Sequence, residues 1–154
     1  MQSFDPASAF LKGLIHYWWL ILLFILLLFV LNFLKSAKFK GKLAEKTTSF
    51  GMSLKLDPSV YRVFNDLIIP DKKGETQIDH VVVSKYGIFV IEVKNYNGWI
   101  FGNKDDAYWT QVIFKDKHRF QNPLRQNYRH IMALSEYLGV DKNFFYSVVF
   151  FPGD

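Results

Sequence analysis

One apolar segment, residues 14–34, constrains this chain more than any other feature. It reads LIHYWWLILLFILLLFVLNFL, and only His16 and Asn32 among its 21 positions are not hydrophobic. At about 1.5 Å per helical residue, this length reaches roughly 31 Å, which matches the ~30 Å hydrocarbon core of a bilayer. The segment therefore predicts a transmembrane helix.

Two other structures contain apolar runs of this kind. A buried core helix is seldom apolar on all sides over such a length. A cleaved signal peptide has a shorter apolar core, of about 7–15 residues, after a positively charged start. Here the preceding residues include one acid, Asp5, and one base, Lys12, and lysines follow the run directly. A retained membrane anchor is the favoured interpretation.

Basic residues gather on one side of this predicted span. Residues 35–46 contain five lysines and one glutamate, which is +4 of the total net charge of +5. Positively charged flanks stay in the cytoplasm, and each lysine close to an anionic leaflet gains about 1 kcal/mol. We therefore expect a single-pass protein of the cell membrane, with residues 1–13 outside and 14–34 in contact with lipid. Residues 35–46 form a basic juxtamembrane segment that also contacts lipid, and the remaining chain is cytoplasmic.

The composition excludes several classes of protein. The chain has no cysteine, which excludes disulfides, thiolate zinc sites, iron–sulfur clusters and cysteine nucleophiles. Hydrophobic residues make up 50% of it, with nine glycines and five prolines, so it is neither collagen-like nor disordered. Residues 47–154 have a net charge of only +1. The basic charge thus indicates membrane topology more than affinity for nucleic acid.

The cytoplasmic part alternates between strand and helix patterns. Strands are predicted at residues 61–69, 77–84, 88–94, 98–101, 108–114 and 144–151, with a turn at 70–74. A helix should begin with Asn122 as its N-cap and Pro123 as its first residue, and end at Gly139. This order predicts an α/β domain of the α+β type, with a mixed sheet and a helix on at least one face.

Helical spacing also predicts which sides of the helices are buried. Five residues form the expected apolar face of the helix after Asn122: Leu124, Tyr128, Ile131, Leu134 and Leu138. Residues 36–50 are compatible with a short helix that has Phe39, Leu43 and Phe50 on one side. We expect Trp99 and Trp109 in the core or at its rim rather than as platforms on which nucleic-acid bases stack.

Two acids and a lysine lie in the hairpin formed by residues 77–94. Apolar residues point to both faces of its second strand, so Glu92 and Lys94 interrupt a buried strand. A turn at Tyr86-Gly87 brings Asp79 near Glu92 across the ladder. These groups need partners, because an unpaired buried charge is very costly.

Two arrangements satisfy this requirement. Two close carboxylates repel each other unless a cation neutralises them, and carboxylate oxygens are ligands that Mg²⁺ accepts. A neighbouring lysine is able to orient a water or stabilise charge on a phosphate, a combination suited to phosphodiester hydrolysis. The alternative is a plain ion pair of Lys94 with Glu92 or Asp79. Since Glu-x-Lys occurs often by chance, the residues alone favour the ion pair.

Two stretches resemble the nuclease-related domain family, NERD: GETQIDHVVVSKYGIFVIEVKNYNGWIFG (residues 74–102) and QNPLRQNYRHIMALSEYLG (residues 121–139). They contain an Ile-Asp-His hairpin, an Ile-Glu-x-Lys-Asn strand, an Asn-x-Gly turn and an Asn-Pro-Leu-x-Gln-Asn helix start, in the family's order. The resemblance covers residues 41–151, and membrane-anchored bacterial members of the family are common. Residues 41–151 are therefore expected to form one nuclease-like domain.

This resemblance implies a restriction-endonuclease-like core of the PD-(D/E)xK type, which acts on DNA or RNA with Mg²⁺ or Mn²⁺. It places the metal-binding acids at Asp79 and Glu92 and the motif's lysine at Lys94. Glu45 matches a family glutamate before the first strand. Ala44, however, replaces the second glycine of the usual Gly-x-x-Gly-Glu pattern, which weakens this match.

The remaining polar candidates have weaker support. Gln126, in the family's helix, is expected to lie near the site and contact Lys94 or a phosphate, although an exposed helix amide is an equal alternative. His80 is expected to pack or form hydrogen bonds on the side of its strand opposite Asp79, and His130 has no partner at zinc-binding spacing. Five basic residues are expected to form a solvated face rather than a phosphate-binding patch: Lys115, Lys117, Arg119, Arg125 and Arg129.

Two functions remain open from the sequence. One is a membrane-anchored, metal-dependent nuclease. The other is a non-catalytic, membrane-tethered module that binds nucleic acid or protein and keeps the acids as structural ion pairs. The second is favoured by the short chain, in which no helicase, kinase or zinc-ribbon segment is found.

A reporter enzyme fused after Asp154 tests the predicted orientation. We expect cytoplasmic reporter activity, because the lysines of residues 35–46 hold the C-terminal side of the span inside. As a control, replacing these lysines with glutamine should produce a mixture of orientations. Reporter activity on the outer side of the membrane for the unmodified sequence would contradict the assignment.

Overall fold

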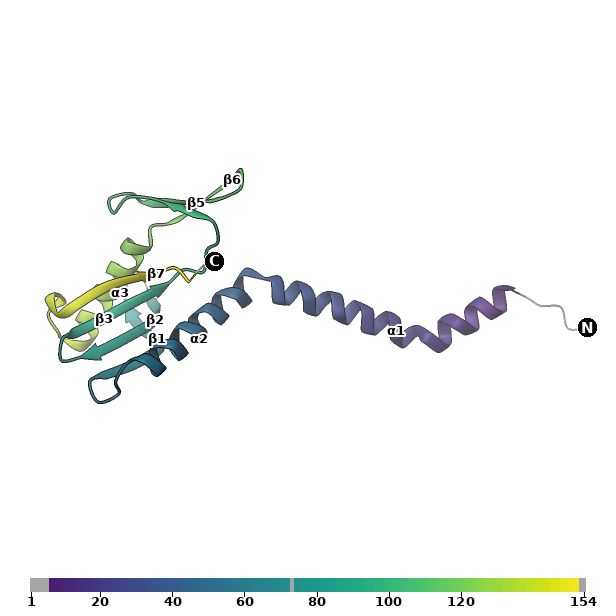
Figure 1. Ribbon diagram of the computed structural model, residues 1–154, viewed down its shortest axis with the longest axis horizontal. Coiled ribbons are helices and arrows are strands. Elements are labelled where there is room, and N and C mark those ends of the chain that lie inside the picture. The colour runs from purple at the N-terminus through teal and green to yellow at the C-terminus, as the bar shows by residue number, and fades with distance from the viewer. Residues whose placement is uncertain (1–5, 73, 153–154) are drawn as a thin grey trace, which may run out of the picture. The chain divides into compact units, whose positions relative to one another are not determined.

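A computed structural model describes residues 6–72 and 74–152 (Figure 1). The chain divides into two compact units, residues 1–40 and 41–154. The elements, in chain order, are α1 (Pro6–Lys35), α2 (Ala37–Lys55), β1 (Tyr61–Asp71), β2 (Gly74–Ser84), β3 (Gly87–Val93), β4 (Trp99–Phe101), β5 (Tyr108–Ile113), β6 (Asp116–Gln121), α3 (Pro123–Leu138), the 3-10 helix η1 (Lys142–Phe144) and β7 (Phe145–Phe150). The predicted α+β fold with an N-terminal apolar helix is confirmed.

Helix α1 contains the apolar segment found in the sequence. Within the described part of the chain, it is the one helix long and apolar enough to cross a membrane, over His16–Lys35 with a mean hydropathy of 2.5. The large apolar side chains of residues 17–34 are between 41% and 70% exposed. A helix that is apolar on all sides and uncovered by protein has the properties of a lipid-facing helix. Residues 1–5, part of the segment expected outside the membrane, lie outside the described residues.

The main sheet has the strand order β1-β2-β3-β7. Strands β1, β2 and β3 pair antiparallel, whereas β7 pairs parallel to β3, so the sheet is mixed as predicted. Gly87 closes the β2–β3 hairpin at φ +133°, and a Cβ there would lie 2.5 Å from the ring of Tyr146. Only glycine fits this close approach and this backbone conformation, so Gly87 sets the position of the turn.

Strand β1 extends further than the sequence predicted. Pro70 and Asp71, expected in a turn, continue the ladder opposite Glu75 and Gly74. Proline has no backbone N–H to donate, but β1 is an edge strand, where an absent donor on the outer side is tolerated. The turn is therefore shorter than predicted, and Lys73 within it lies outside the described residues.

Helix α3 begins and ends where the sequence predicted. The side chain of Asn122 accepts a hydrogen bond from the backbone N–H of Leu124 at 2.9 Å, with Pro123 in the first turn. Gly139 ends the helix in the left-handed conformation, at φ 64°. The Asn122 amide also donates to the backbone oxygens of Asn103, Lys104 and Asp106. One side chain therefore caps the helix and holds the loop between β4 and β5.

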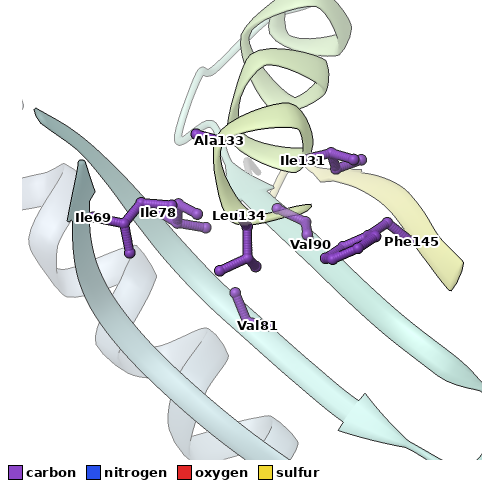
Figure 2. Close-up of a cluster of buried hydrophobic side chains, with 8 residues drawn as sticks. All are labelled: Ile69, Ile78, Val81, Val90, Ile131, Ala133, Leu134 and Phe145. Atoms are coloured by element: carbon purple, nitrogen blue, oxygen red, sulfur yellow. The ribbon is translucent and has the colours of Figure 1, made fainter. Parts of the chain in front are cut away.

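The hydrophobic core lies between α3 and one face of the main sheet (Figure 2). Leu134 points from α3 toward Val81 of β2, and Ile131 lies over the side of the sheet that carries Phe145. The buried cluster consists of Ile69, Ile78, Val81, Val90, Ile131, Ala133, Leu134 and Phe145. These side chains fix α3 against all four strands.

The buried face of α3 differs from the predicted one. Tyr128 and Leu138, expected to be buried, are 56% and 50% exposed, whereas Asn127 and His130 are 0% and 3% exposed. The prediction counted only apolar residues, but the amide of Asn127 donates to Val90 O at 2.8 Å, Ser147 Oγ at 2.9 Å and Val148 O at 3.1 Å. Polar groups are readily buried where the sheet offers them partners.

Helix α2 also buries a different side from the one predicted. Leu43 and Phe50 are 54% and 65% exposed, while Ala44, Glu45 and Thr48 are partly buried. The C-terminal half of α2 and the following Leu56 line a cavity of about 470 Å³ together with residues of β3 and β7, on the sheet face away from α3. The inward side of α2 thus consists of small and polar residues, which leave space for the cavity and for the side chain of Glu45.

The second sheet has the order β4-β5-β6. Strands β4 and β5 correspond to predicted strands. Strand β6 was not predicted, because its sequence DKHRFQ is mostly polar and three of its first four residues are charged. Trp109 packs near Phe120 and Phe151 at the rim of the domain. Trp99, expected in the core or at its rim, is 74% exposed.

Replacing Asn127 with alanine should destabilise the domain. The substitution removes the hydrogen bonds of Asn127 to the buried Val90 carbonyl, to Ser147 and to Val148, which costs about 1–3 kcal/mol of unfolding free energy. Urea unfolding of the full chain in detergent, followed by circular dichroism, measures this loss. The exposed Asn143→Ala serves as the matched control and should change stability by less than about 0.5 kcal/mol. Equal stability of the two variants would contradict the role of Asn127.

Candidate active site

The site begins where β2 and β3 separate. Their ladder pairs Val81 with Val90 and His80 with Ile91, and ends there. Strand β3 continues beside β7, with Glu92 opposite Val149. The carboxylate of Asp79 accepts the backbone N–H of Val93 at 2.7 Å. A side-chain oxygen of β2 thus bonds the N–H of β3 just beyond the last backbone pair, and places Asp79 beside Glu92 as predicted.

Regular alternation along β2 breaks at Asp79. Ile78 and Val81 are three residues apart and yet belong to the same buried cluster, which a strictly alternating strand does not allow. Opposite Asp79, Asp66 of β1 adopts a left-handed conformation with φ 55°, and the pair Asp66–Asp79 is absent from the otherwise continuous register. Such local breaks redirect side chains next to functional sites.

Glu92 and Lys94 form a buried ion pair. Lys94 Nζ lies 2.6 Å from Glu92 Oε1, and the two side chains are 19% and 3% exposed. Lys94 Nζ also donates to Gln126 Oε1 of α3 at 3.0 Å. The lysine directly follows β3 and is therefore held between an acid of that strand and an amide of α3, which confirms the expected contact between Lys94 and Gln126.

His130 completes this network and was missed by the sequence analysis. Its Nε2 lies 3.2 Å from Glu92 Oε2, and its Nδ1 lies 3.0 Å from the hydroxyl oxygen of Thr76. An ionised carboxylate only accepts hydrogen bonds, so we infer that Nε2 carries a proton and donates to Glu92, while Nδ1 bonds the Thr76 hydroxyl. The available signal was its spacing of four residues from Gln126, one helical turn.

The pKa values of the two acids are shifted in opposite directions. Burial raises the pKa of Asp79 to about 6 against the opposing hydrogen bond from Val93, and Glu92 and Glu45 add smaller contributions in the same upward direction. Burial would also raise the pKa of Glu92, but the hydrogen bonds from His130 and Lys94 hold it below its usual value. Glu92 is thus an ionised, compensated acid, whereas Asp79 carries charge that its surroundings do not fully compensate.

A cavity of about 280 Å³ lies beside Asp79. Its lining residues come from α2, β1 and β2 and include Lys42, Glu45, Asp66 and Asp79. Glu45 faces the same space as Asp79, and its pKa is raised by burial and by Asp66. Glu92, Lys94 and Gln126 are not among the lining residues. The site therefore has two parts, an acidic cavity and a buried ion-pair network, which meet at Asp79.

His80 lies in the wall of this cavity. Its Nδ1 is 2.9 Å from Asn65 Oδ1, and the side chain is 2% exposed. Burial lowers its pKa. His80 is thus a packed, hydrogen-bonded residue, as expected from the sequence.

The donor set fits a hard divalent cation with few protein ligands. No three histidine, aspartate or glutamate side chains of the described residues are grouped closely enough to form a complete metal site. Mg²⁺ commonly uses only one or two carboxylates and keeps several waters. Asp79 and Glu92 are the neighbouring acids of the hairpin, and burial raises the pKa of Asp79, a shift that a cation bound to its carboxylate would oppose.

The five basic residues considered in the sequence do not gather into one phosphate-binding patch around the site. Arg129 is paired with Asp71, and Arg125 donates to the backbone oxygen of Asp105. Lys115, Lys117 and Arg119 lie instead on the β5–β6 hairpin. The two arginines of α3 are therefore engaged in contacts within the domain.

Comparison with known proteins identifies the class of this domain. The family described as nuclease-related domain, NERD, matches residues 40–152. An uncharacterized protein of Bacillus anthracis is 49% identical over 98 residues, which cover 63% of this chain and 46% of that protein. The chain thus spans about half the length of this relative. No solved structure matches the chain. With its family matched over most of its length, the chain belongs to the nuclease-related domain family, NERD.

Proposed function

We propose that this chain is a membrane-anchored, cytoplasm-facing nuclease that hydrolyses phosphodiester bonds in DNA or RNA with Mg²⁺ or Mn²⁺. The observation that carries the proposal is the Glu92–Lys94 pair beside Asp79, at the point where β2 and β3 separate. Membership of the nuclease-related family supports the reaction class. In this proposal residues 1–13 lie outside the cell, 14–34 span the bilayer, 35–46 contact anionic lipid, and 41–151 form the nuclease domain.

The acids have distinct roles in the proposed reaction. Asp79 and Glu92 would hold the divalent ion, and Glu45, which lines the same cavity as Asp79, would complete the set of acids around it. When bound, the ion supplies Lewis acidity to the phosphate and lowers the pKa of a bound water. Asp79 must be ionised to act as a ligand, so cation binding and loss of its proton are coupled.

Lys94 is proposed to position the attacking water or a phosphate oxygen. A lysine ammonium has three protons, and Glu92 and Gln126 accept two of those of Lys94. The third is available to a water or to the oxygen of a substrate. Gln126 and Glu92 thus act as positioning residues that fix the direction of this proton.

A second candidate function has one observation in its favour. Both oxygens of Glu92 already have partners, Lys94 at 2.6 Å and His130 at 3.2 Å. Such a network is also what a purely structural ion pair requires. On this alternative the domain is a non-catalytic module, tethered to the membrane, that binds nucleic acid or protein.

Cleavage of nucleic acid by the full chain in detergent distinguishes these functions. We expect cleavage of DNA or RNA with Mg²⁺ or Mn²⁺, and a loss of at least about 100-fold in the Asp79→Asn and Lys94→Met variants, because each removes a group that contacts the reacting atoms. Gel analysis of end-labelled substrates measures the rates. Asp105→Asn and Lys142→Met, which change exposed residues of the same types, should cleave like the unmodified chain.

Calorimetric titration with Mn²⁺ identifies the reason for any inactive result. A single binding site that is lost in Asp79→Asn supports the nuclease. Absence of both cleavage and Mn²⁺ binding supports the non-catalytic module. Equal cleavage by the unmodified chain and both site variants, with folding confirmed by circular dichroism, would refute the assigned residues.

The raised pKa of Asp79 predicts a pH-dependent stability in the absence of metal. Because its folded-state pKa of about 6 exceeds the unfolded value, the neutral acid stabilises the fold fully below about pH 4, and this contribution is lost as pH rises through 6. Thermal unfolding in EDTA should therefore show Asp79→Asn gaining stability relative to the unmodified chain between about pH 4 and pH 6.5. The exposed Asp116→Asn should follow the unmodified chain. Parallel curves for Asp79→Asn would contradict the shift.

A further inference from the structure

One face of the β4-β5-β6 sheet carries aromatic rings and cations that have no role in the site described above. Cross-strand partners point to the same face of a sheet. The register pairs Trp99 with Val112 and Val112 with Lys117, and pairs Phe101 with Thr110 and Thr110 with Arg119. Tyr108 shares the face because it lies two residues before Thr110. The aromatic–basic face is defined by Trp99, Phe101, Tyr108, Lys117 and Arg119.

The three rings of this face are open to solvent. Trp99, Phe101 and Tyr108 are 74%, 57% and 54% exposed. The opposite face of the same sheet carries Trp109 and Phe120, which contact rings of the rest of the domain. The sheet is therefore attached through one face, and the aromatic–basic face remains uncovered. Neighbouring exposed rings of this kind mark interaction surfaces.

The arrangement repeats in two rows across the sheet. Each row has an aromatic ring on β4, a smaller residue on β5, Val112 or Thr110, and a cation on β6. Because neighbouring strands lie about 4.8 Å apart, the ring and the cation of each row are separated by roughly 10 Å, and the smaller side chain of β5 lies between them. The guanidinium of Arg119 also lies 5.0 Å from the ring centre of Tyr108. Rings and cations are thus interleaved on one shallow surface.

The charge of this face is complementary to a polyanion. Its two charged residues are both basic, and Asp116 of the same hairpin pairs with Ile113 and points to the other face. Trp99 and Phe101 are two residues apart on one strand, roughly 7 Å, and present their rings side by side. Unpaired bases stack on such rings while neighbouring cations contact the phosphates, whereas the bases of a duplex are already stacked.

We propose that the aromatic–basic face binds single-stranded nucleic acid, with bases stacked on Trp99, Phe101 and Tyr108 and phosphates at Lys117 and Arg119. The inference rests on the proposed function for nucleic acid as the substrate, and it names the form of that substrate. The second sheet is then the surface that receives the strand, separate from the acids that act on it.

Binding is measured apart from cleavage. The full chain in phosphatidylcholine nanodiscs, in EDTA, is titrated into a fluorescein-labelled single strand of about 20 nucleotides, which exceeds the ~4–16 nucleotides contacted by common single-strand-binding folds. The matching duplex and anionic lipid vesicles are the two comparison ligands. Fluorescence anisotropy gives the dissociation constants for the oligonucleotides, and co-sedimentation reports vesicle binding.

Each ring should contribute strongly to single-strand binding. We expect Trp99→Ala and Phe101→Ala to weaken it roughly 5- to 150-fold each, the range for loss of one stacked base. Trp99→Phe should retain most of the binding, whereas Trp99→Leu should lose it, because stacking needs a ring and not only an apolar group. Lys117→Ala should reduce the salt dependence of log K by about 0.7. Tyr137→Ala, an aromatic that is 62% exposed on α3, is the matched control and should bind like the unmodified chain.

Three results would overturn the inference. The first is that a Trp99→Ala, Phe101→Ala double variant binds the single strand as well as the unmodified chain does. The second is that the duplex binds as tightly as the single strand. The third is that these variants lose vesicle binding without losing oligonucleotide binding. The last result would assign the face to the membrane. Binding that depends on the rings, without cleavage under any metal, refutes the nuclease alone. Cleavage that is indifferent to the ring variants refutes the binding face alone.

Discussion

The buried carboxylate of Glu92 is the constraint on which the arrangement of this domain depends. An acid in the interior of a sheet must be compensated, and removing one partner of a buried pair costs about 3–5 kcal/mol. Lys94 supplies one partner from the residue after β3, and His130 supplies the other from α3. Together with the hydrogen bonds that Asn127 donates to the backbones of β3 and β7, these contacts determine which face of α3 meets the sheet. The orientation of α3 about its own axis therefore determines both the packing of Leu134 in the core and the geometry of the site.

Asp79 and Glu92 are close in the hairpin but differ in their surroundings, and this difference gives them different chemistry. Glu92 receives two donors and stays ionised, whereas Asp79 receives one backbone N–H and has a pKa raised by burial. A cation near both acids would therefore change the protonation of Asp79 and leave that of Glu92 nearly unaltered. Glu92 then acts mainly as a fixed point of the site, and Asp79 is the group whose charge responds to what enters the cavity.

Local patterns predicted the parts of this fold that depend on neighbouring residues. The Asn122 cap, the Gly139 end of α3 and the hairpin register that brings Asp79 to Glu92 follow from turn and capping chemistry, so they were readable in the sequence. The partners of Glu92 were only partly readable, because the resemblance pointed to Gln126 and not to His130. A count of apolar residues left His130 and Asn127 out of the buried face, since their partners lie twenty or more residues away along the chain. The same separation hid the inward side of α2, where Glu45 and small residues replace the expected Leu43 and Phe50.

The distribution of charge explains how a nearly neutral domain can still be suited to nucleic acid. Most of the basic excess lies in residues 35–46, beside the predicted span, and little of it is left for the domain. Two cations on the aromatic–basic face contribute a salt dependence of only about −1.4 in log K against log salt, by the single-strand value of about 0.7 per phosphate. Rings must then provide most of the affinity, and because every base has a π-face, a surface of this kind tolerates many sequences. On the proposed topology, an anchor at residues 14–34 would confine the domain to the membrane surface and so offset the weak electrostatic attraction that the aromatic–basic face exerts on a strand.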